Sequence, residues 1–195
     1  MIKLTDNVFE ILLILLRNRP LNLNDIARQT MLSVMGVSKI VKKLEKEKLV
    51  TITKIGKSHI VKINVIRDNI EIFSLSEKYK FEKFIKHHPE LKGFLLMLKE
   101  NIKAHFCLIF GSYASGEEST SSDLDLLIVS NVDDTKMINK LKALLNINLE
   151  PMFVKKKDFI NELRKKHRLY LEIMNGKRIL INGEYNFWET VYEIF

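Results

Sequence analysis

The second half of the chain is best understood from GSYASGEESTSSDLDLL, residues 111–127. An apolar run, FCLIF, precedes its Gly-Ser pair, and Asp123 and Asp125 open the next apolar run, DLDLLIV. Side chains alternate along a strand, so the two aspartates share one face while Leu124 and Leu126 point into the core. Two like charges held together repel each other, and a cation relieves that repulsion. The pair is therefore either an ordinary polar strand start or a metal site. Mg²⁺ is the expected ion, because it accepts one or two carboxylates plus substrate phosphates.

The Gly-Ser pair supplies a phosphate contact. Gly111 lets the backbone approach an anion closely, and the Ser112 hydroxyl and the amides after it are suited to phosphate oxygens. No Gly-Lys-Ser/Thr sequence follows, so the turn is not a P-loop. Read singly, each of these features is common, but the order of strand, Gly-Ser, loop and Asp-x-Asp rarely arises by chance and indicates a site for a phosphate group and a metal ion.

This segment closely resembles the signature of the minimal nucleotidyltransferases of the DNA polymerase β superfamily, and the similarity continues in outline to ILINGEYNFW, residues 179–188. The resemblance implies a small mixed β-sheet flanked by helices, with Gly111 and Ser112 at the triphosphate and Asp123 and Asp125 at the metal. It implies transfer of a nucleoside monophosphate from a nucleoside triphosphate, ATP before others, to an acceptor. Two Mg²⁺ ions would activate the attacking hydroxyl and stabilise the leaving oxygen.

The implied chemistry needs a third carboxylate on a neighbouring strand, and we interpret Glu150 as this catalytic and metal-binding residue. Glu150 lies in INLEPMFV, where alternation places it with Asn148 and Met152 on one face. An ordinary charge at a strand end is the alternative. Ser115 departs from the family pattern, which often has Arg before the glycine, and this leaves the contacts to the nucleotide open. The alternative to catalysis is a transcription regulator whose nucleotidyltransferase fold only binds a nucleotide as a sensor.

The positive charge of the chain is concentrated in its first third. Residues 1–70 hold 13 Lys or Arg against 6 Asp or Glu, whereas residues 71–195 hold 19 against 18. Clustered basic side chains attract phosphates by counterion release. This asymmetry suggests that the first part of the chain meets a polyanion.

Three helices are predicted in the basic part. Residues 6–18 are amphipathic and end before Pro20, and Asn24 is expected to cap a second helix that ends near Thr30. Ser33 is expected to cap a third helix, whose apolar stripe consists of Val37, Ile40, Val41 and Leu44.

A basic hairpin follows, because two alternating apolar runs flank a turn at residues 54–58. Through LNLNDIARQTMLSVMGVSKIVKKLEKEKLV, residues 21–50, this order of elements resembles the winged helix-turn-helix domains of the MarR-like transcription regulators. The resemblance implies that the third helix enters a DNA major groove and that the hairpin touches the backbone or minor groove. A solvated helix face and a protein-binding winged helix are the alternatives. The side chains expected to face DNA are Ser33, Ser38, Lys39, Lys42, Lys43, Lys54, Lys57 and His59.

The expected fold class is α+β, in three segments. Residues 1–70 form a winged helix-turn-helix domain of three helices plus a hairpin wing. Residues 71–103 form a helical linker, which Pro89 divides into two helices. Residues 104–195 form the nucleotidyltransferase domain.

The remaining expectations concern partners and location. Cys107 is the single cysteine, which excludes an internal disulfide and favours a reducing cytoplasm. No apolar run reaches the roughly 18 residues of a membrane span, so no membrane partner is expected. The expected partners are DNA, a nucleoside triphosphate, a second copy of the chain as in many winged helices, and an acceptor. The superfamily resemblance allows that acceptor to be a partner toxin, such as a helical HEPN-type protein.

Overall fold

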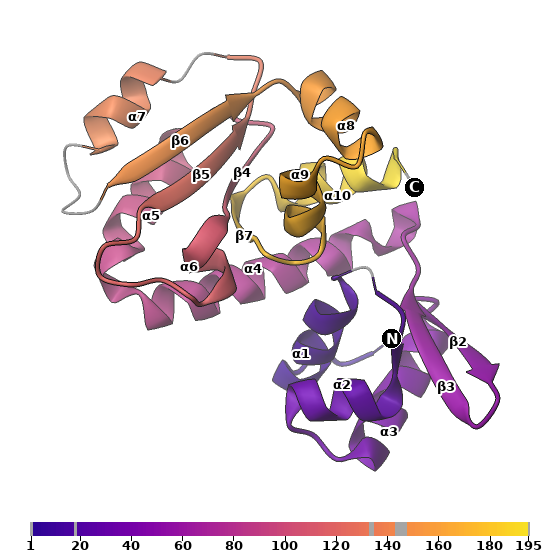
Figure 1. Ribbon diagram of the computed structural model, residues 1–195. Coiled ribbons are helices and arrows are strands. Elements are labelled where there is room, and N and C mark those ends of the chain that lie inside the picture. Colours follow the sequence, from indigo (N-terminus) through magenta and orange to yellow (C-terminus); the bar gives the residue numbers. More distant parts are fainter. Residues whose placement is uncertain (1, 18, 133–134, 143–147, 195) are drawn as a thin grey trace.

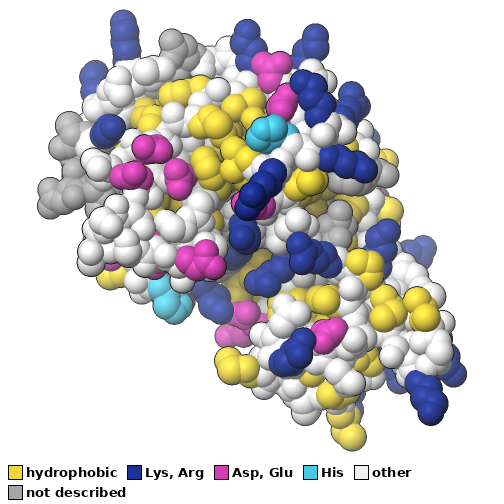
Figure 2. Space-filling model, viewed as in Figure 1, with side chains coloured by type: hydrophobic (Ala, Val, Ile, Leu, Met, Phe, Trp, Pro, Cys, Tyr) yellow, Lys and Arg dark blue, Asp and Glu magenta, His cyan; other side chains and the backbone are white. Residues whose placement is uncertain are grey.

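The computed structural model describes residues 2–17, 19–132, 135–142 and 148–194 (Figure 1). The chain is α+β, as predicted. One three-stranded sheet, in the order β1-β3-β2, lies in the N-terminal part, and a four-stranded sheet, in the order β6-β5-β4-β7, lies in the C-terminal part. The two parts form a smaller and a larger lobe (Figures 1 and 2). None of the described helices is long and apolar enough to cross a bilayer.

The smaller lobe has the helix, helix-turn-helix, hairpin order of a winged helix. Its helices are α1 (Asp6–Leu15), α2 (Leu23–Thr30) and α3 (Val34–Lys46). The wing consists of β2 (Val50–Ile55) and β3 (Ser58–Ile63), which pair antiparallel. Apolar residues from all five elements pack into one core. This arrangement confirms the winged helix expected from the sequence.

The start of α2 differs from the prediction. The Asn22 side chain, and not that of Asn24, accepts a hydrogen bond from the Asp25 backbone N–H at 2.9 Å. The physical reason is the short strand β1 (Leu21–Asn22), which pairs antiparallel with β3 and delivers the chain to the helix two residues earlier. Asn24 is exposed and was wrongly predicted as the cap.

The start of α3 and the tip of the wing follow simple local rules. The Ser33 hydroxyl accepts a hydrogen bond from the Gly36 N–H at 3.1 Å, so Ser33 caps α3 as predicted. The wing turn is tighter than predicted, because Ile55 still pairs with Ser58 and only two residues connect the strands. The first of these, Gly56, has φ of 59°, which suits a two-residue hairpin turn.

The segment expected to be a linker consists of α4 (Ile70–His87) and α5 (Pro89–Asn101), divided at Pro89 as predicted. It also contributes to both cores. Phe73 near the start of α4 packs with the winged helix residues, whereas Phe81 and Phe84 near its end pack beneath the larger sheet. The helix α4 is therefore a structural element of both lobes.

The larger sheet contains β4 (Phe106–Ile109), β5 (Leu124–Val129), β6 (Leu149–Val154) and β7 (Ile179–Asn182). The pair β5 and β6 is parallel, and β4 is antiparallel to both β5 and β7. This is the mixed sheet that the family resemblance implies.

Helices cover both faces of the larger sheet (Figure 1). On one face α5 and α7 (Thr135–Lys142) pack over Leu124, Leu126 and Ile128 of β5. The sequence pattern also predicts a helix over residues 134–145 and a strand that begins at Ile147, and both lie partly outside the described residues. On the other face Leu127 and Val129 meet the apolar residues of three helices, namely α8 (Lys156–Arg164), α9 (Arg168–Met174) and α10 (Glu184–Tyr192).

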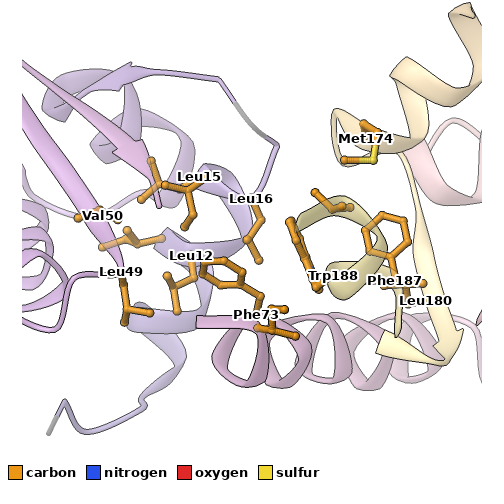
Figure 3. Close-up of a cluster of buried hydrophobic side chains, with 14 of the residues drawn as sticks. Leu12, Leu15, Leu16, Leu49, Val50, Phe73, Met174, Leu180, Phe187 and Trp188 are labelled. Atoms are coloured by element: carbon orange, nitrogen blue, oxygen red, sulfur yellow. The ribbon is translucent and has the colours of Figure 1, made fainter. Parts of the chain in front are cut away.

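The core of the smaller lobe continues into this second face (Figure 3). Leu16, immediately after α1, is 1% exposed, and Trp188 of α10 is 2% exposed. The Trp188 and Phe73 ring centroids lie 5.2 Å apart. The two lobes therefore share one apolar core, with α4 running through it.

A buried polar network lies on the same boundary. Glu77 of α4 and Arg178 form an ion pair in which each side chain is 1% exposed. The Arg178 guanidinium also donates to the Ile173 carbonyl at 2.8 Å, and the Lys80 ammonium donates to the Gly176 carbonyl at 2.8 Å. Burial lowers the pKa of Lys80 to about 8. These contacts fix the loop between α9 and β7 against α4.

Candidate active site

The two aspartates lie at the start of β5. The strand begins at Leu124, so Asp123 directly precedes it, and Asp125 is its second residue. Both aspartates are half-buried. Leu124 and Leu126 pack into the core beneath α5, while Leu127 packs on the opposite face of the sheet. Strand alternation therefore places Asp125 on the face of Leu127, and Asp123 leads onto the same face.

Gly111 places backbone directly against the Asp125 carboxylate. It opens the short helix α6 (Gly111–Ser115), which stands where the sequence predicted only a sharp turn, and its φ is +68°. A Cβ atom at this position would overlap Asp125 Oδ2 and lie 3.0 Å from its Cγ. The Phe110 N–H donates to the Asp125 carbonyl at 3.1 Å. Only glycine fits here, both for its backbone conformation and for its lack of a side chain.

Ser112 follows in the first turn of α6. Its carbonyl accepts hydrogen bonds from the Ser115 hydroxyl at 3.1 Å and from the Glu117 N–H at 3.0 Å. The Ser112 side chain is half-buried and lines a cavity beside Gly111. The Gly-Ser pair and Asp125 are thus brought together as the sequence predicts.

Glu150 lies beside Asp125 on the neighbouring parallel strand. The two residues are paired in the register of β5 and β6. Leu149 is buried on the α5 side of the sheet, so Glu150 points to the same face as Asp125, where it is exposed. Pro151 follows without breaking the pairing.

The pKa of Asp125 is raised above its usual value, first by burial and then by the charges of Glu150 and Asp123. The three carboxylates therefore act on one another electrostatically. Within the described ranges, no three His, Cys, Asp or Glu side chains form a closed metal-binding group. Hard carboxylate oxygens, a raised pKa and backbone packed against Asp125 fit Mg²⁺. This ion is commonly held by one or two carboxylates and completed by substrate phosphates and water.

A cavity of about 380 Å³ adjoins the Gly-Ser pair. Its lining includes Gly111, Ser112, the apolar side chains Leu169 and Ile173 of α9, and Lys177. This volume lies within the range of about 300–1,000 Å³ that is typical of small-molecule sites. Lys177 was not singled out from the sequence, because an exposed lysine in a loop has no distinguishing local pattern.

Two family models match separate parts of the chain. Residues 95–185 match the family described as polymerase beta, nucleotidyltransferase, and residues 2–57 match the MarR family. The part of the chain that matches the MarR family is called the MarR-type domain, and the part that matches the nucleotidyltransferase family is called the nucleotidyltransferase domain. The matched nucleotidyltransferase range contains the Gly-Ser pair, both aspartates and Glu150.

The chain is also similar to a curated protein of Methanocaldococcus jannaschii that is described as a candidate protein adenylyltransferase. The identity is 29% over 96 residues, which cover 44% of this chain and 63% of that protein. The chain thus spans less than two thirds of the length of this relative. No solved structure shows a significant match to the chain.

The MarR-type domain presents the basic side chains expected to face DNA. Val37, Val41 and Leu44 turn the apolar side of α3 into the core, and this leaves its lysines outside. Ser38 is half-buried. The exposed members of the expected set are Ser33, Lys39, Lys42 and Lys43 at α3 and Lys54, Lys57 and His59 on the wing.

Two methionines next to these residues were not predicted to belong to this surface from the sequence. Met31 is 93% exposed and Met35 is 70% exposed, although apolar residues are usually expected in a core. Met31 ends α2 in the left-handed conformation, with φ of 56°, which turns its side chain away from the core. Both side chains lie beside Ser33, at the end of α3 that enters a groove in winged helices.

Proposed function

We propose that this protein is a Mg²⁺-dependent nucleotidyltransferase that transfers AMP from ATP to a hydroxyl group of an acceptor protein. The observation that carries the proposal is the packing of the Gly111 backbone against the Asp125 carboxylate, with Glu150 beside it. Without a cation and a phosphate this arrangement leaves like charges together at the edge of a cavity. The adenylyltransferase description of the relative supports AMP as the group and protein as the acceptor.

Each residue has a role in this proposal. Gly111 and Ser112 would hold the terminal phosphates, and Asp123 and Asp125 would hold the metal. Bound Mg²⁺ would neutralise the triphosphate and favour ionisation of the acceptor hydroxyl. Glu150 would take the hydroxyl proton as the oxygen attacks the α-phosphorus. The bond from that phosphorus to the bridging oxygen then breaks, and pyrophosphate leaves with the electron pair.

The MarR-type domain would bind DNA as a homodimer, through α3 and the wing. A chain that both binds DNA and modifies a protein suits an autoregulated antitoxin, and a helical HEPN-type toxin is the acceptor we would test first. This choice follows from the superfamily resemblance.

A nucleotide sensor is the second candidate function. The observation that favours it is the common core of the two lobes, since a ligand bound at the larger sheet then acts on elements that also support the winged helix. In this case ATP would bind without transfer and change the affinity for DNA.

The deciding experiment uses ATP labelled at the α-phosphate or at the γ-phosphate, with Mg²⁺, in an extract of the source cells. Label from the α-position should appear on a protein with the natural chain and disappear with Asp125→Asn. The matched control is Asp158→Asn, because Asp158 is an exposed aspartate on α8. Transfer of γ-label would contradict the proposed reaction. If the chain binds ATP but no label appears on a protein, the result would favour the nucleotide sensor.

A further inference from the structure

A second cavity lies on the boundary between the two lobes. Its volume is about 350 Å³, and it is lined by Arg17 and Arg19 from the MarR-type domain and by Lys177 from the nucleotidyltransferase domain. Ser115 and Glu117 also line it. These two residues and Lys177 line the cavity beside Gly111 as well, so the two spaces adjoin.

The charge of this boundary cavity is predominantly positive. Arg17, Arg19 and Lys177 face one carboxylate, that of Glu117, which accepts a hydrogen bond from the Ser115 hydroxyl at 3.1 Å. No ion pair to a described residue is formed by any of the three cations. Figure 2 shows Lys and Arg side chains gathered over the junction of the lobes. Three unpaired cations around one concave space favour an anionic ligand.

The loop that carries Lys177 is held in place by contacts with Arg17 and with α4. Gly176 has φ of +89°, and a Cβ atom there would lie 2.6 Å from Arg17 Cγ, so the aliphatic part of Arg17 packs on bare backbone. Lys80, which is half-buried, donates to the carbonyls of Gly176 at 2.8 Å and Arg178 at 2.5 Å. These are the residues on either side of Lys177. Its backbone is therefore fixed by α4, and less ordering is needed when a ligand binds.

The half-buried Lys80 lies behind this loop, and its charge adds to the positive potential there. Arg17, Lys80 and Arg178 are close enough for the two arginines to oppose the charge on Lys80, while Glu77 favours it. Surroundings of low polarity screen these charges weakly, which strengthens the positive electrostatic field at the boundary cavity.

We propose that Arg17, Arg19 and Lys177 bind the terminal phosphates of the nucleoside triphosphate that Gly111 and Ser112 also hold. The MarR-type domain then supplies part of the nucleotide site. This inference rests on the nucleotide site of the proposed function, and it assigns the boundary cavity to the phosphate end of the ligand, with the apolar wall of α9 left for the nucleoside.

The test is a binding series with ATP, ADP and AMP in the presence of Mg²⁺, measured by calorimetry on the full chain. Arg17→Gln, Arg19→Gln and Lys177→Gln should each weaken ATP binding roughly tenfold, because each removes a charged hydrogen bond. AMP binding should change less than about twofold, because AMP lacks the terminal phosphates. Arg17→Lys should recover part of the affinity. The control is Arg28→Gln, since Arg28 is an exposed arginine of the same domain that pairs with Asp25 instead.

The outcomes separate this inference from the proposed reaction. Equal weakening of ATP and AMP, or unchanged ATP binding, overturns the role of the three cations even if labelled AMP is transferred. Selective weakening of ATP supports it even if transfer never occurs, and then only the reaction is wrong. Thermal melting of each variant shows whether the fold is intact, and Arg17→Lys keeps the test decisive if Arg17→Gln unfolds.

Discussion

At Gly111 one added methyl group would collide with the carboxylate of Asp125. Gly111→Ala should therefore displace Asp125 or α6 and reduce nucleotide transfer by about 100-fold or more, as a misplacement of about 1 Å can do. Initial rates of AMP transfer measure this effect.

Gly116 provides the matched control. Its φ is +72°, close to that of Gly111, but a Cβ atom there meets nothing within 4 Å. Gly116→Ala should cost about 1–2 kcal/mol in the free energy of unfolding, because of backbone strain, and should leave the transfer rate nearly unchanged. If both variants keep full activity, the contact between Gly111 and Asp125 has no catalytic role.

Glu150 can be tested through its effect on Asp125. Its charge contributes to the raised pKa of Asp125, so Glu150→Gln should lower that pKa. Folding raises the pKa of this carboxyl, so the folded state is destabilised relative to the unfolded state as the pH rises from the unfolded-state pKa through the folded-state pKa. In Mg²⁺-free solution the variant should lose less stability over that acidic range. Carbon NMR titration of the Asp125 carboxyl measures the shift, and an unchanged pKa would mean that Glu150 lies too far away.

Part of the site could be predicted residue by residue. Period-two alternation is enough to place Asp123 and Asp125 on one face of their strand. Glu150 was selected through the family resemblance, and its pairing with Asp125 is seen only in the structure. Arg17 and Lys177 could not be found in this way, since they are far apart in the sequence and meet only when the two lobes pack. The local sequence around each of them is typical of an ordinary solvated basic residue.

At the level of elements, local signals predicted α3 and the wing well and the start of α2 poorly. Ser33 caps α3 because a hydroxyl one residue before the helix reaches its free amides. Asn22 and Asn24 are chemically identical, and only the pairing of β1 with β3 selects the first. The predicted helix over residues 6–18 ends earlier, at Leu15, with Leu16 as its cap residue.

The capping assignment gives a direct comparison. Asn22→Ala should lower the free energy of unfolding by about 1 kcal/mol through loss of the hydrogen bond to the Asp25 N–H. Asn24→Ala should change it by less than about 0.5 kcal/mol, because Asn24 is exposed. Urea denaturation of both variants decides between them. A larger effect at Asn24 would contradict the structure.

The recognition surface is also a property of an element. If α3 lies in a DNA groove, Lys42→Gln should reduce the slope of log affinity against log salt concentration by about one unit. Lys140→Gln is the control, because Lys140 is exposed on α7 in the other domain. Equal slopes for the natural chain and Lys42→Gln would exclude a phosphate contact at this position.

At the scale of the whole molecule, the core that the two lobes share predicts a single unfolding transition. Trp188 is the single tryptophan, and it packs on Phe73 at the boundary. Its fluorescence and the far-ultraviolet circular dichroism should therefore change together on heating. Leu16→Ala should lower the free energy of unfolding by about 2–5 kcal/mol without splitting the transition. Met35→Ala, at an exposed site, should have little effect. Two separate transitions would show that the lobes are independent.

The double role of α4 could not be read from the sequence. Its apolar spacing predicts a helix but does not say which surfaces its two ends meet. Glu77 and Lys80 look like solvated charges in a lysine-rich segment. In the structure Glu77 is buried in an ion pair with Arg178, and the half-buried Lys80 donates to two backbone carbonyls. Tertiary partners of this kind leave no local trace.

The shared core also has a consequence for synthesis on the ribosome, because its residues are added at very different times. Phe73 is made early, but Trp188, which covers it, is added only after all four strands of the larger sheet. During that interval the apolar face of α4 stays open to water and to other nascent chains, which is the state in which multidomain proteins misassemble. A messenger RNA truncated before the codon for Trp188 would therefore yield an aggregation-prone fragment and not a working DNA-binding domain.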